Sequence, residues 1–350
     1  MSVAVNRPFQ LGRGPWKTLD PFLFCVFHED RFPKGEGKTL GPAPQLLRGR
    51  DLTMDFSYQD GWSMYHGTTV PGFPQHPHRG FETITCAMKG LVDHFDSMGA
   101  TGRYGDGDVQ WMTAGGGVQH SEMFPLVNTD KPNPMELFQI WLNLPAAKKD
   151  ATPFFEMFWA PQVPVVTAGD AEVTVVAGPV HGSNPCTPPP DSWAAVPDNE
   201  VAVWIVRIRK AGGKVTLPAA QHGKAINRTA YFFKGGAKSV SFNAADRSSV
   251  SLSPMTAVQL DPTVSVDVTA SQDGDAEVLI LQGRPIGEPV VQRGPFVATS
   301  AEDLGAVIQR YHRTEFGGWP WPSSDVVHDQ SKQRFAKRPG AKEEEFPPKA

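Results

Sequence analysis

Four side chains with the chemistry of metal ligands lie in two short stretches of this sequence. His76 and His78 are two residues apart in PQHPHRGFE, and His120 and Glu122 are two residues apart in GGGVQHSEM. Imidazole nitrogens and carboxylate oxygens suit divalent first-row metals, and iron is our first expectation. Four such ligands would leave one or two positions of a six-coordinate ion open. Water, substrate or O2 could bind there, which is typical of a catalytic site.

Strands would bring these side chains together. Side chains two residues apart on a strand point to the same face, with Cα atoms roughly 6.6 Å apart. Each pair would therefore share a face, and two neighbouring strands of a barrel would direct all four side chains to its interior. Glu82 follows His78 by four residues and would share its face on a regular strand. Spacing alone therefore leaves Glu82 and Glu122 as alternative carboxylate ligands.

The remaining histidines lack such a partner in sequence. We expect them to have surface or hydrogen-bonded structural roles. They are His28, His66, His94, His181, His222, His312 and His328.

Short strand patterns dominate the elements that would carry the site. Residues 81–88 and 91–99 are rich in β-branched and aromatic residues, and the Lys-Gly between them predicts a hairpin. Apolar residues alternate through 135–145, and strand patterns resume from 201 to 283. Glycine and proline together are about a fifth of the chain, above the usual roughly 12%. These features predict an all-β chain with a barrel or sandwich in each half.

Three further segments complete the organisation. Residues 146–200 are rich in proline and indicate a linker or long surface loop. A helix is predicted over 300–313, where Ser300 and Asp303 form a variant capping box. A weak internal repeat relates 78–96 to 227–242, each with a Lys-Gly turn between strands.

Composition excludes several classes of function. The 350-residue chain is 40% hydrophobic and carries a net charge of −4, which argues against direct nucleic-acid contact. We expect no membrane association, because the longest apolar run is far too short to span a bilayer and the N-terminus lacks a signal-peptide pattern. Three widely spaced cysteines indicate a cytoplasmic or nuclear location. They are Cys25, Cys86 and Cys186.

Longer motifs resemble the pirin family of the cupin superfamily. The similar segments are HPHRGFETIT, GDVQWMTAGGGVQHSEM, WLNLP, LDPFLF and RTEFGGWPWPSSD, which together run from near residue 19 to near residue 335. The resemblance implies a bicupin of two tandem antiparallel jelly-roll β-barrels, with the C-terminal helix and tail packed against the first barrel. It also implies a monomer.

The resemblance gives domain limits and a ligand set. We expect a metal-binding barrel at 1–145, a linker at 146–200, a metal-free barrel at 201–298, and the helix and tail at 299–350. The family ligands fall on His76, His78, His120 and Glu122, which implies Glu122 rather than Glu82 as the carboxylate. Ala225 and Asn227 take the places of the first two histidines in the second barrel. The turn DGD, at 106–108, replaces the Pro-Gly-Asp of many family members.

The resemblance implies three possible functions. One is a quercetin 2,3-dioxygenase type of oxidoreductase, in which iron or another divalent first-row metal binds a small oxygenated aromatic substrate and O2. Glu122 would then be both ligand and general base. The second is an iron- or redox-sensing transcription co-regulator that binds a protein partner without turnover. The third is a binding module for an oxygenated metabolite.

Overall fold

Strands make up most of the regular structure of the chain. The computed structural model describes residues 3–349, and α1 (Ala301–Thr314) is the one α-helix in that range. Contacts divide the chain into two compact units. Unit 1 comprises the chain up to Val26, Trp141–Asn143 and Gln162–Gly287, and unit 2 comprises Phe27–Ile140, Leu144–Pro161 and the chain from Glu288. No helix within 3–349 has the length and apolar character needed to cross a bilayer.

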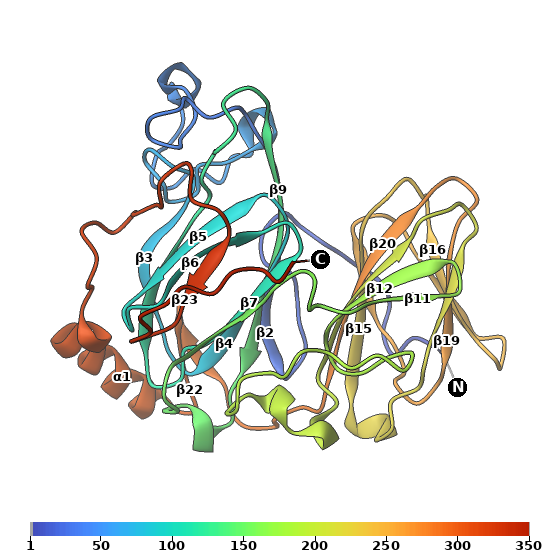
Figure 1. Cartoon of the computed structure of the whole chain (residues 1–350). Helices are drawn as coiled ribbons and strands as arrows, with labels where there is room; N and C mark the ends of the chain where they lie inside the picture. The colour runs from blue at the N-terminus through green and yellow to red at the C-terminus, as the bar shows by residue number, and fades with distance from the viewer. Residues whose placement is uncertain (1–2, 350) are drawn as a thin grey trace. The chain divides into compact units, whose positions relative to one another are not determined.

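Unit 2 is built on two five-stranded sheets (Figure 1). The first has the order β10-β7-β4-β9-β2. Its strands are β2 (Phe22–Phe32), β4 (Phe81–Lys89), β7 (Asp108–Thr113), β9 (Asn133–Asn143) and β10 (Phe154–Phe158). The second has the order β23-β6-β5-β8-β3. Its strands are β3 (Gly72–His78), β5 (Leu91–Asp96), β6 (Thr101–Gly105), β8 (Val118–Met123) and β23 (Phe335–Lys337).

The two sheets of unit 2 enclose one interior. Thr85 on β4 donates a hydrogen bond across this interior to Glu122 on β8. Alternate residues on each strand face inward, as the period of two requires. Apolar side chains fill much of the space, and they include Val92, Tyr104, Leu137, Phe155 and Met157. This barrel therefore combines an apolar core with a polar group at β3 and β8.

Unit 1 contains a seven-stranded and a four-stranded sheet. The larger sheet has the order β1-β18-β15-β20-β13-β12-β11. Its strands are β1 (Phe9–Gln10), β11 (Val165–Ala168), β12 (Ala171–Ala177), β13 (Ala202–Ile208), β15 (Asn227–Lys234), β18 (Thr256–Gln259) and β20 (Ala276–Gly283). The smaller sheet, β14-β19-β16-β17, comprises β14 (Lys214–Leu217), β16 (Val240–Ala244), β17 (Ser249–Leu252) and β19 (Val266–Ala270). The core of unit 1 is mostly aliphatic, with many buried valines.

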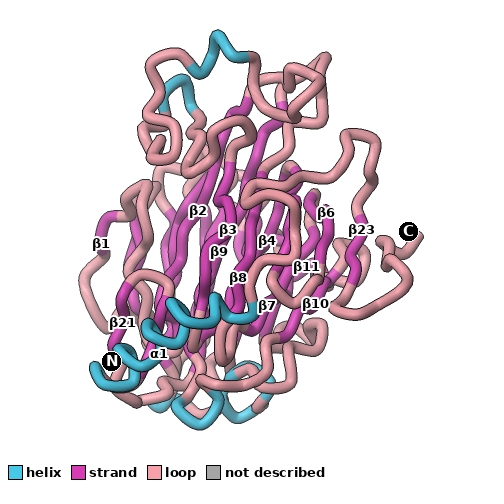
Figure 2. The backbone as a smooth tube through the Cα atoms, turned by 90° about the vertical axis from the view of Figure 1, so that its left-hand side faces the viewer, coloured by secondary structure: helices cyan, strands magenta, loops and turns pink. Residues whose placement is uncertain are grey.

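The C-terminal segment packs on the sheet of unit 2 that contains β3 and β8. The Ser300 side chain accepts a hydrogen bond from the backbone N–H of Asp303, so α1 begins as its capping residues predict. Figure 2 shows α1 lying across the strands, and the Tyr311 hydroxyl donates to Gln119 on β8. Farther on, β23 pairs with β6 and extends that sheet.

Short elements complete the described chain. The remaining strands are β21 (Val291–Arg293) and β22 (Phe296–Ala298), which pair with each other. The 3-10 helices are η1 (Pro44–Leu47), η2 (Gln59–Gly61), η3 (Ala146–Lys148), η4 (Trp193–Ala195), η5 (Pro197–Asn199), η6 (Gly223–Ala225) and η7 (Glu315–Gly317).

The structure differs from two expectations of the sequence analysis. The predicted hairpin over 81–99 is wrong, because β4 and β5 belong to different sheets and do not pair. Gly90, with φ of +79°, turns the chain from one sheet to the other. The segment 146–200, predicted as a linker, contains β10, β11 and β12. The proline-rich stretch lies at 184–199, after these three strands, and the linker prediction extended its signal over the whole segment.

Candidate metal centre

Two neighbouring strands carry the three histidines of the sequence motif. β3 and β8 pair antiparallel, with His76 directly opposite His120 and a register shift between Phe73 and His76. The Nε2 atom of His120 lies 2.9 Å from Nε2 of His78 and 3.0 Å from Nε2 of His76. One ligand atom from each of the three residues lies within 4.8 Å of the others. We call this group the histidine triad.

The protonation of the triad suits a metal ion. His76 Nδ1 lies 2.8 Å from the Pro74 carbonyl oxygen, so Nδ1 carries the proton and Nε2 keeps a lone pair. Burial lowers the pKa of His76 to about 4, and it holds the pKa values of His78 and His120 well below the usual range. Desolvation disfavours imidazolium, and neutral imidazole is the form that binds metals.

The spacing of the nitrogens also fits a metal ion. Lone pairs that face one another at such short distances repel unless a cation lies among them. Two nitrogens that bind one ion at about 2.1 Å and at right angles are about 3.0 Å apart. The observed separations of 2.9 and 3.0 Å agree with this value. The residues present therefore fit the metal ion that the sequence motif implies.

Glu122 lies beside the triad and is held by three donors. Its Oε2 atom is 3.7 Å from His120 Nε2 and accepts a hydrogen bond from the Gln139 side chain. Its Oε1 atom accepts from the Thr85 hydroxyl at 3.1 Å and from the Tyr104 hydroxyl at 3.4 Å. Burial raises the pKa of Glu122, which makes its carboxylate a stronger base than an exposed one. Glu122 is outside the compact group formed by the triad, so its role as a ligand stays a prediction.

Glu82 takes a different place. The chain turns at Gly80, where φ is +88°, and Glu82 lies on β4 rather than on a continuation of β3. Its Oε1 atom accepts a hydrogen bond from the Thr113 hydroxyl at 2.7 Å. Glu82 was an alternative ligand only if a regular strand continued from His78 to Glu82. The turn at Gly80 interrupts that strand.

Sequence reasoning missed a histidine of this interior. His94 on β5 lies directly opposite Glu122 on β8, and its ring centroid is 5.5 Å from that of His120. Its Nε2 atom is 3.2 Å from an oxygen of Asp96, and both side chains are fully buried. His94 and Asp96 are two residues apart, the same spacing as in the other pairs. That spacing was the signal that could have identified them.

The other histidines lie outside the triad. His28 and His66 belong to an aromatic cluster near His76, and His328 stacks on Phe95. His222 is close to Glu200 in unit 1. In unit 1, Ala225 ends η6 and Asn227 begins β15, where its side chain donates to the carbonyl oxygen of Asp20.

The triad is accessible from one side. His78 and His120 are buried, with 2% and 0% of their surface exposed, whereas His76 is only half-buried. The neighbours Phe73, Pro74 and Gln75 are also half-buried. A molecule that approaches the triad from solvent therefore meets His76 first.

Comparison with known proteins agrees with this architecture. The family description "Pirin" matches residues 39–142, and "Pirin C-terminal cupin domain" matches residues 208–317. A solved structure of quercetin 2,3-dioxygenase from Acinetobacter baumannii superposes with a TM-score of 0.66 and 25% identity, covering 91% of this chain and 97% of that one. The chain is thus a cupin with two β-barrels.

Two curated relatives extend the comparison over most of the chain. A putative quercetin 2,3-dioxygenase of Pseudomonas aeruginosa is 32% identical over 70% of this chain and 79% of its own length. A pirin-like protein of Caulobacter vibrioides is 34% identical over 80% of this chain and 91% of its own length. The two family matches within this chain and its similarity to these relatives show that the chain belongs to the pirin family.

Proposed function

We propose that this protein is a mononuclear metal oxidoreductase of the quercetin 2,3-dioxygenase type. The observation that carries the proposal is the histidine triad, in which three neutral imidazoles direct Nε2 atoms toward one another at 2.9 and 3.0 Å. The proposed ligands are His76, His78, His120 and Glu122, and the proposed metal is iron or another divalent first-row ion. The metal, when bound, supplies a Lewis acid that orients the substrate oxygens and activates the ring toward O2.

Glu122 is the proposed general base. A flavonol binds through its adjacent hydroxyl and carbonyl oxygens, and Glu122 accepts the proton of that hydroxyl at a carboxylate oxygen. Burial raises the pKa of this carboxylate, so the proton transfer is less uphill than it would be to an exposed glutamate. The hydrogen bonds from Thr85, Tyr104 and Gln139 hold both oxygens in place.

The complete reaction opens the central ring of the flavonol. Both atoms of one O2 molecule enter the organic product, two carbon–carbon bonds of the ring break, and one ring carbon leaves as carbon monoxide. The deprotonated hydroxyl supplies the electron density for this oxidation, and no external reductant is needed. Two relatives in Pseudomonas aeruginosa are described as putative quercetin 2,3-dioxygenases, which supports this choice of substrate class.

Metal analysis tests the site before any assay of turnover. We expect the purified protein to contain about one metal ion per chain, and His76→Ala to lose most of it, because the triad loses one of its three nitrogen ligands. His312→Ala is the matched control, since His312 is exposed on α1. Equal metal content in wild type and His76→Ala would refute the site.

An oxygen electrode and detection of carbon monoxide then test the reaction. The metal-loaded protein should consume O2 and release carbon monoxide from a flavonol. No turnover over a panel of flavonols and metals would exclude the dioxygenase. The co-regulator function makes the opposite prediction, namely no O2 consumption and a protein partner bound more tightly in one oxidation state of iron.

A further inference from the structure

An aromatic cluster lies on the accessible side of the histidine triad. Phe73 is next to His76, with ring centroids 6.3 Å apart in an edge-on arrangement. His66 lies 5.6 Å from Phe73, and Phe56 lies 5.1 Å from His66 and 6.5 Å from Phe73. We call Phe56, His66 and Phe73 the aromatic face. It leads from the half-buried His76 to Phe56, which is 52% exposed.

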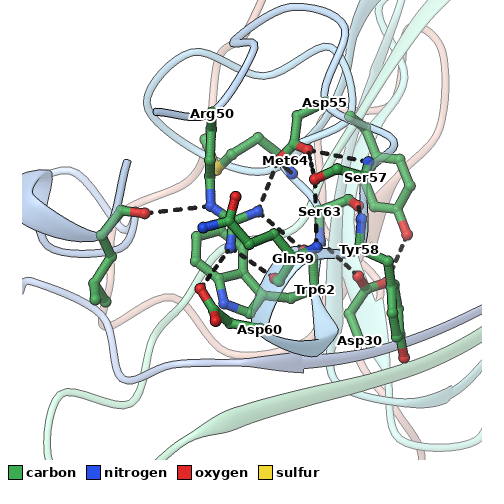
Figure 3. A network of polar contacts seen from close by, with 12 residues as sticks. Asp30, Arg50, Asp55, Ser57, Tyr58, Gln59, Asp60, Trp62, Ser63 and Met64 are labelled. Atoms are coloured by element: carbon green, nitrogen blue, oxygen red, sulfur yellow. Dashed lines mark hydrogen bonds and ion pairs between the residues drawn. The ribbon is translucent and has the colours of Figure 1, made fainter. Parts of the chain in front are cut away.

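The loop that carries Phe56 is held by buried polar contacts (Figure 3). Arg50 donates to Asp55 at 2.8 Å and to the Trp62 carbonyl oxygen at 3.0 Å, and its guanidinium lies 3.4 Å from the centre of the Trp62 ring. Asp55 also accepts from the Ser57 hydroxyl and from the backbone N–H of Met64. Phe56 is thus fixed between two anchored residues. An exposed aromatic ring on a rigid loop is a preorganised contact surface, because little entropy is lost when a ligand binds.

A series of hydrogen bonds from Asp30 through Tyr65 ends at His28, whose ring contacts that of Phe73. When Asp30 is ionised, the Tyr65 hydroxyl donates to it at 2.7 Å, so the single proton of this hydroxyl is used there. His28 Nδ1, which is 2.8 Å from the same hydroxyl oxygen, must therefore donate to it. The proton of the His28 ring is on Nδ1, and Nε2 is left as a hydrogen-bond acceptor.

Phe73 connects this series of hydrogen bonds to the metal centre. Its ring contacts that of His28, with centroids 5.8 Å apart, as well as that of His76. The Tyr65 ring stacks on Phe73 at 5.2 Å. The rings of Tyr65, His28 and Phe73 therefore form one cluster that reaches His76, and His28 keeps 9% of its surface exposed. This combination matches a planar aromatic molecule that carries a hydroxyl group away from its metal-binding oxygens.

We propose that the aromatic face and His28 recognise a planar phenolic substrate of the metal centre. Phe56 and Phe73 contact the rings of the substrate, and His28 Nε2 accepts a hydrogen bond from a phenolic hydroxyl. This inference rests on the proposed function for the identity of the ligand. It adds residues that determine specificity, none of which belongs to the proposed ligand set.

Binding of quercetin to the full-length metal-free protein, measured by calorimetry, tests the aromatic face. We expect Phe56→Ala and Phe73→Leu each to weaken binding by about three- to tenfold, the usual contribution of an aromatic contact. Met54→Ala is the matched control, because Met54 is 59% exposed on the same loop and is not part of the aromatic face. Equal affinities in wild type, Phe56→Ala and Phe73→Leu would overturn the proposal, provided that circular dichroism shows folded variants.

Two flavonols, with and without hydroxyls on the pendant ring, test the proposed hydrogen bond to His28. His28→Phe keeps a ring against Phe73 and removes the acceptor nitrogen. We expect it to weaken binding of quercetin by about two- to tenfold and to leave unchanged the binding of a flavonol without hydroxyls on its pendant ring. An equal effect on both flavonols, or on neither, would remove His28 from the proposal.

The same variants separate this inference from the proposed function. Loss of affinity in Phe56→Ala together with absence of turnover in the metal-loaded wild type would retain the recognition surface and reject the dioxygenase. Turnover with the same KM and kcat in wild type, Phe56→Ala and Phe73→Leu would retain the dioxygenase and reject the recognition surface. A raised KM with unchanged kcat would support both.

Discussion

At the scale of single residues, Glu122 is the most constrained group of the candidate site. Both carboxylate oxygens accept hydrogen bonds, and the nearest triad nitrogen is 3.7 Å away. These donors orient the carboxylate beside His120. Glu122 is therefore held in place beside the histidine triad, as its proposed role as ligand and proton acceptor requires.

Replacement of Glu122 by glutamine should separate catalysis from folding. The amide has the same shape but cannot accept a proton, so we expect kcat for a flavonol to fall by about 100-fold or more. Glu82→Gln is the matched control, because Glu82 is equally buried and bonds to Thr113. Steady-state kinetics with measured metal content is the test. A kcat of Glu122→Gln within a few-fold of the wild-type value would exclude Glu122 as the general base.

The chain of Asp30, Tyr65 and His28 makes an unusual prediction for pH. Burial lowers the pKa of His28 from 6.5 to about 4 and raises that of Asp30 from 3.8 to about 7. Between pH 4 and 6.5 the unfolded chain binds more protons at His28, so this residue makes stability rise with pH. Over nearly the same range the folded chain binds more protons at Asp30, so that residue makes stability fall with pH. The two contributions oppose each other in the wild type.

Single variants should expose each contribution. Relative to the metal-free wild type, the free energy of unfolding of His28→Gln should fall as pH rises from about 4.5 to 6.5, and that of Asp30→Asn should rise. Each difference should approach about 1.4 kcal/mol per pH unit. Urea unfolding at several pH values measures both. Parallel pH profiles for the wild type and both variants would contradict this pairing.

The sequence identified the triad because a period of two is a local property of strands. His76, His78 and His120 needed only the pairing of β3 with β8 to meet. Spacing alone could not choose between Glu82 and Glu122, and the choice of Glu122 came from the family resemblance. The turn at Gly80, which spacing does not reveal, places Glu82 on another strand. His94 was missed, since its position opposite Glu122 depends on the pairing of β5 with β8.

At the scale of elements, two Lys-Gly turns have the same role. Lys89-Gly90 leads from β4 in one sheet of unit 2 to β5 in the other, and Lys234-Gly235 leads from β15 to β16 in the two sheets of unit 1. Both glycines have positive φ, +79° and +128°. The sequence repeat thus marks a crossing between sheets. The local sequence pattern of such a crossing is the same as that of a hairpin. Only the packing of the two sheets distinguishes a crossing from a hairpin.

The Arg103–Asp93 pair attaches the C-terminal segment to β5 and β6. Arg103 donates to both carboxylate oxygens of Asp93 at 2.6 and 2.7 Å, and also to the carbonyl oxygens of His328, Asp329 and Lys332. Both side chains of the pair are fully buried. One ion pair therefore organises the segment that precedes β23.

Removal of the Arg103 charge should lower the free energy of unfolding substantially. Arg103→Met leaves Asp93 buried without its cation, so we expect a loss of about 3–5 kcal/mol in the free energy of unfolding. Lys238→Met is the matched control, since Lys238 forms an exposed pair with Asp273 and its replacement should cost under about 1 kcal/mol. Chemical denaturation measures both. Similar losses in the two variants would disagree with the assignment of Arg103 as the main attachment.

At the scale of the whole molecule, two barrels share one chain but differ in polar content. The interior of unit 2 contains the triad, Glu122, His94 and Gln139, whereas the core cluster of unit 1 is apolar and mostly aliphatic. The number of barrels was predictable from strand spacing and from the pirin motifs. The strands within 146–200 were not predicted, because the proline-rich stretch at 184–199 was taken to represent the whole segment.

Metal binding should therefore stabilise one unit locally. Addition of metal to the metal-free protein should slow amide hydrogen exchange in β3 and β8, because a ligand that binds only the folded site opposes local opening. Exchange in β14, β16 and β17 of unit 1 should stay the same. Hydrogen-exchange mass spectrometry resolves these peptides. Equal protection of both units would show that the metal acts on more than the triad.

The pairing of β6 with β23 has a consequence for synthesis on the ribosome. Arg103 at β6 and Asp329 near β23 are 226 residues apart in sequence, yet they are hydrogen-bonded. At about 5–20 residues per second, roughly 10–45 s pass between the emergence of the two segments. During this time the edge of β6 is an unpaired template for other nascent chains. The first barrel to be translated is thus the last to be completed, and a chaperone that shields this edge would raise the yield of native protein.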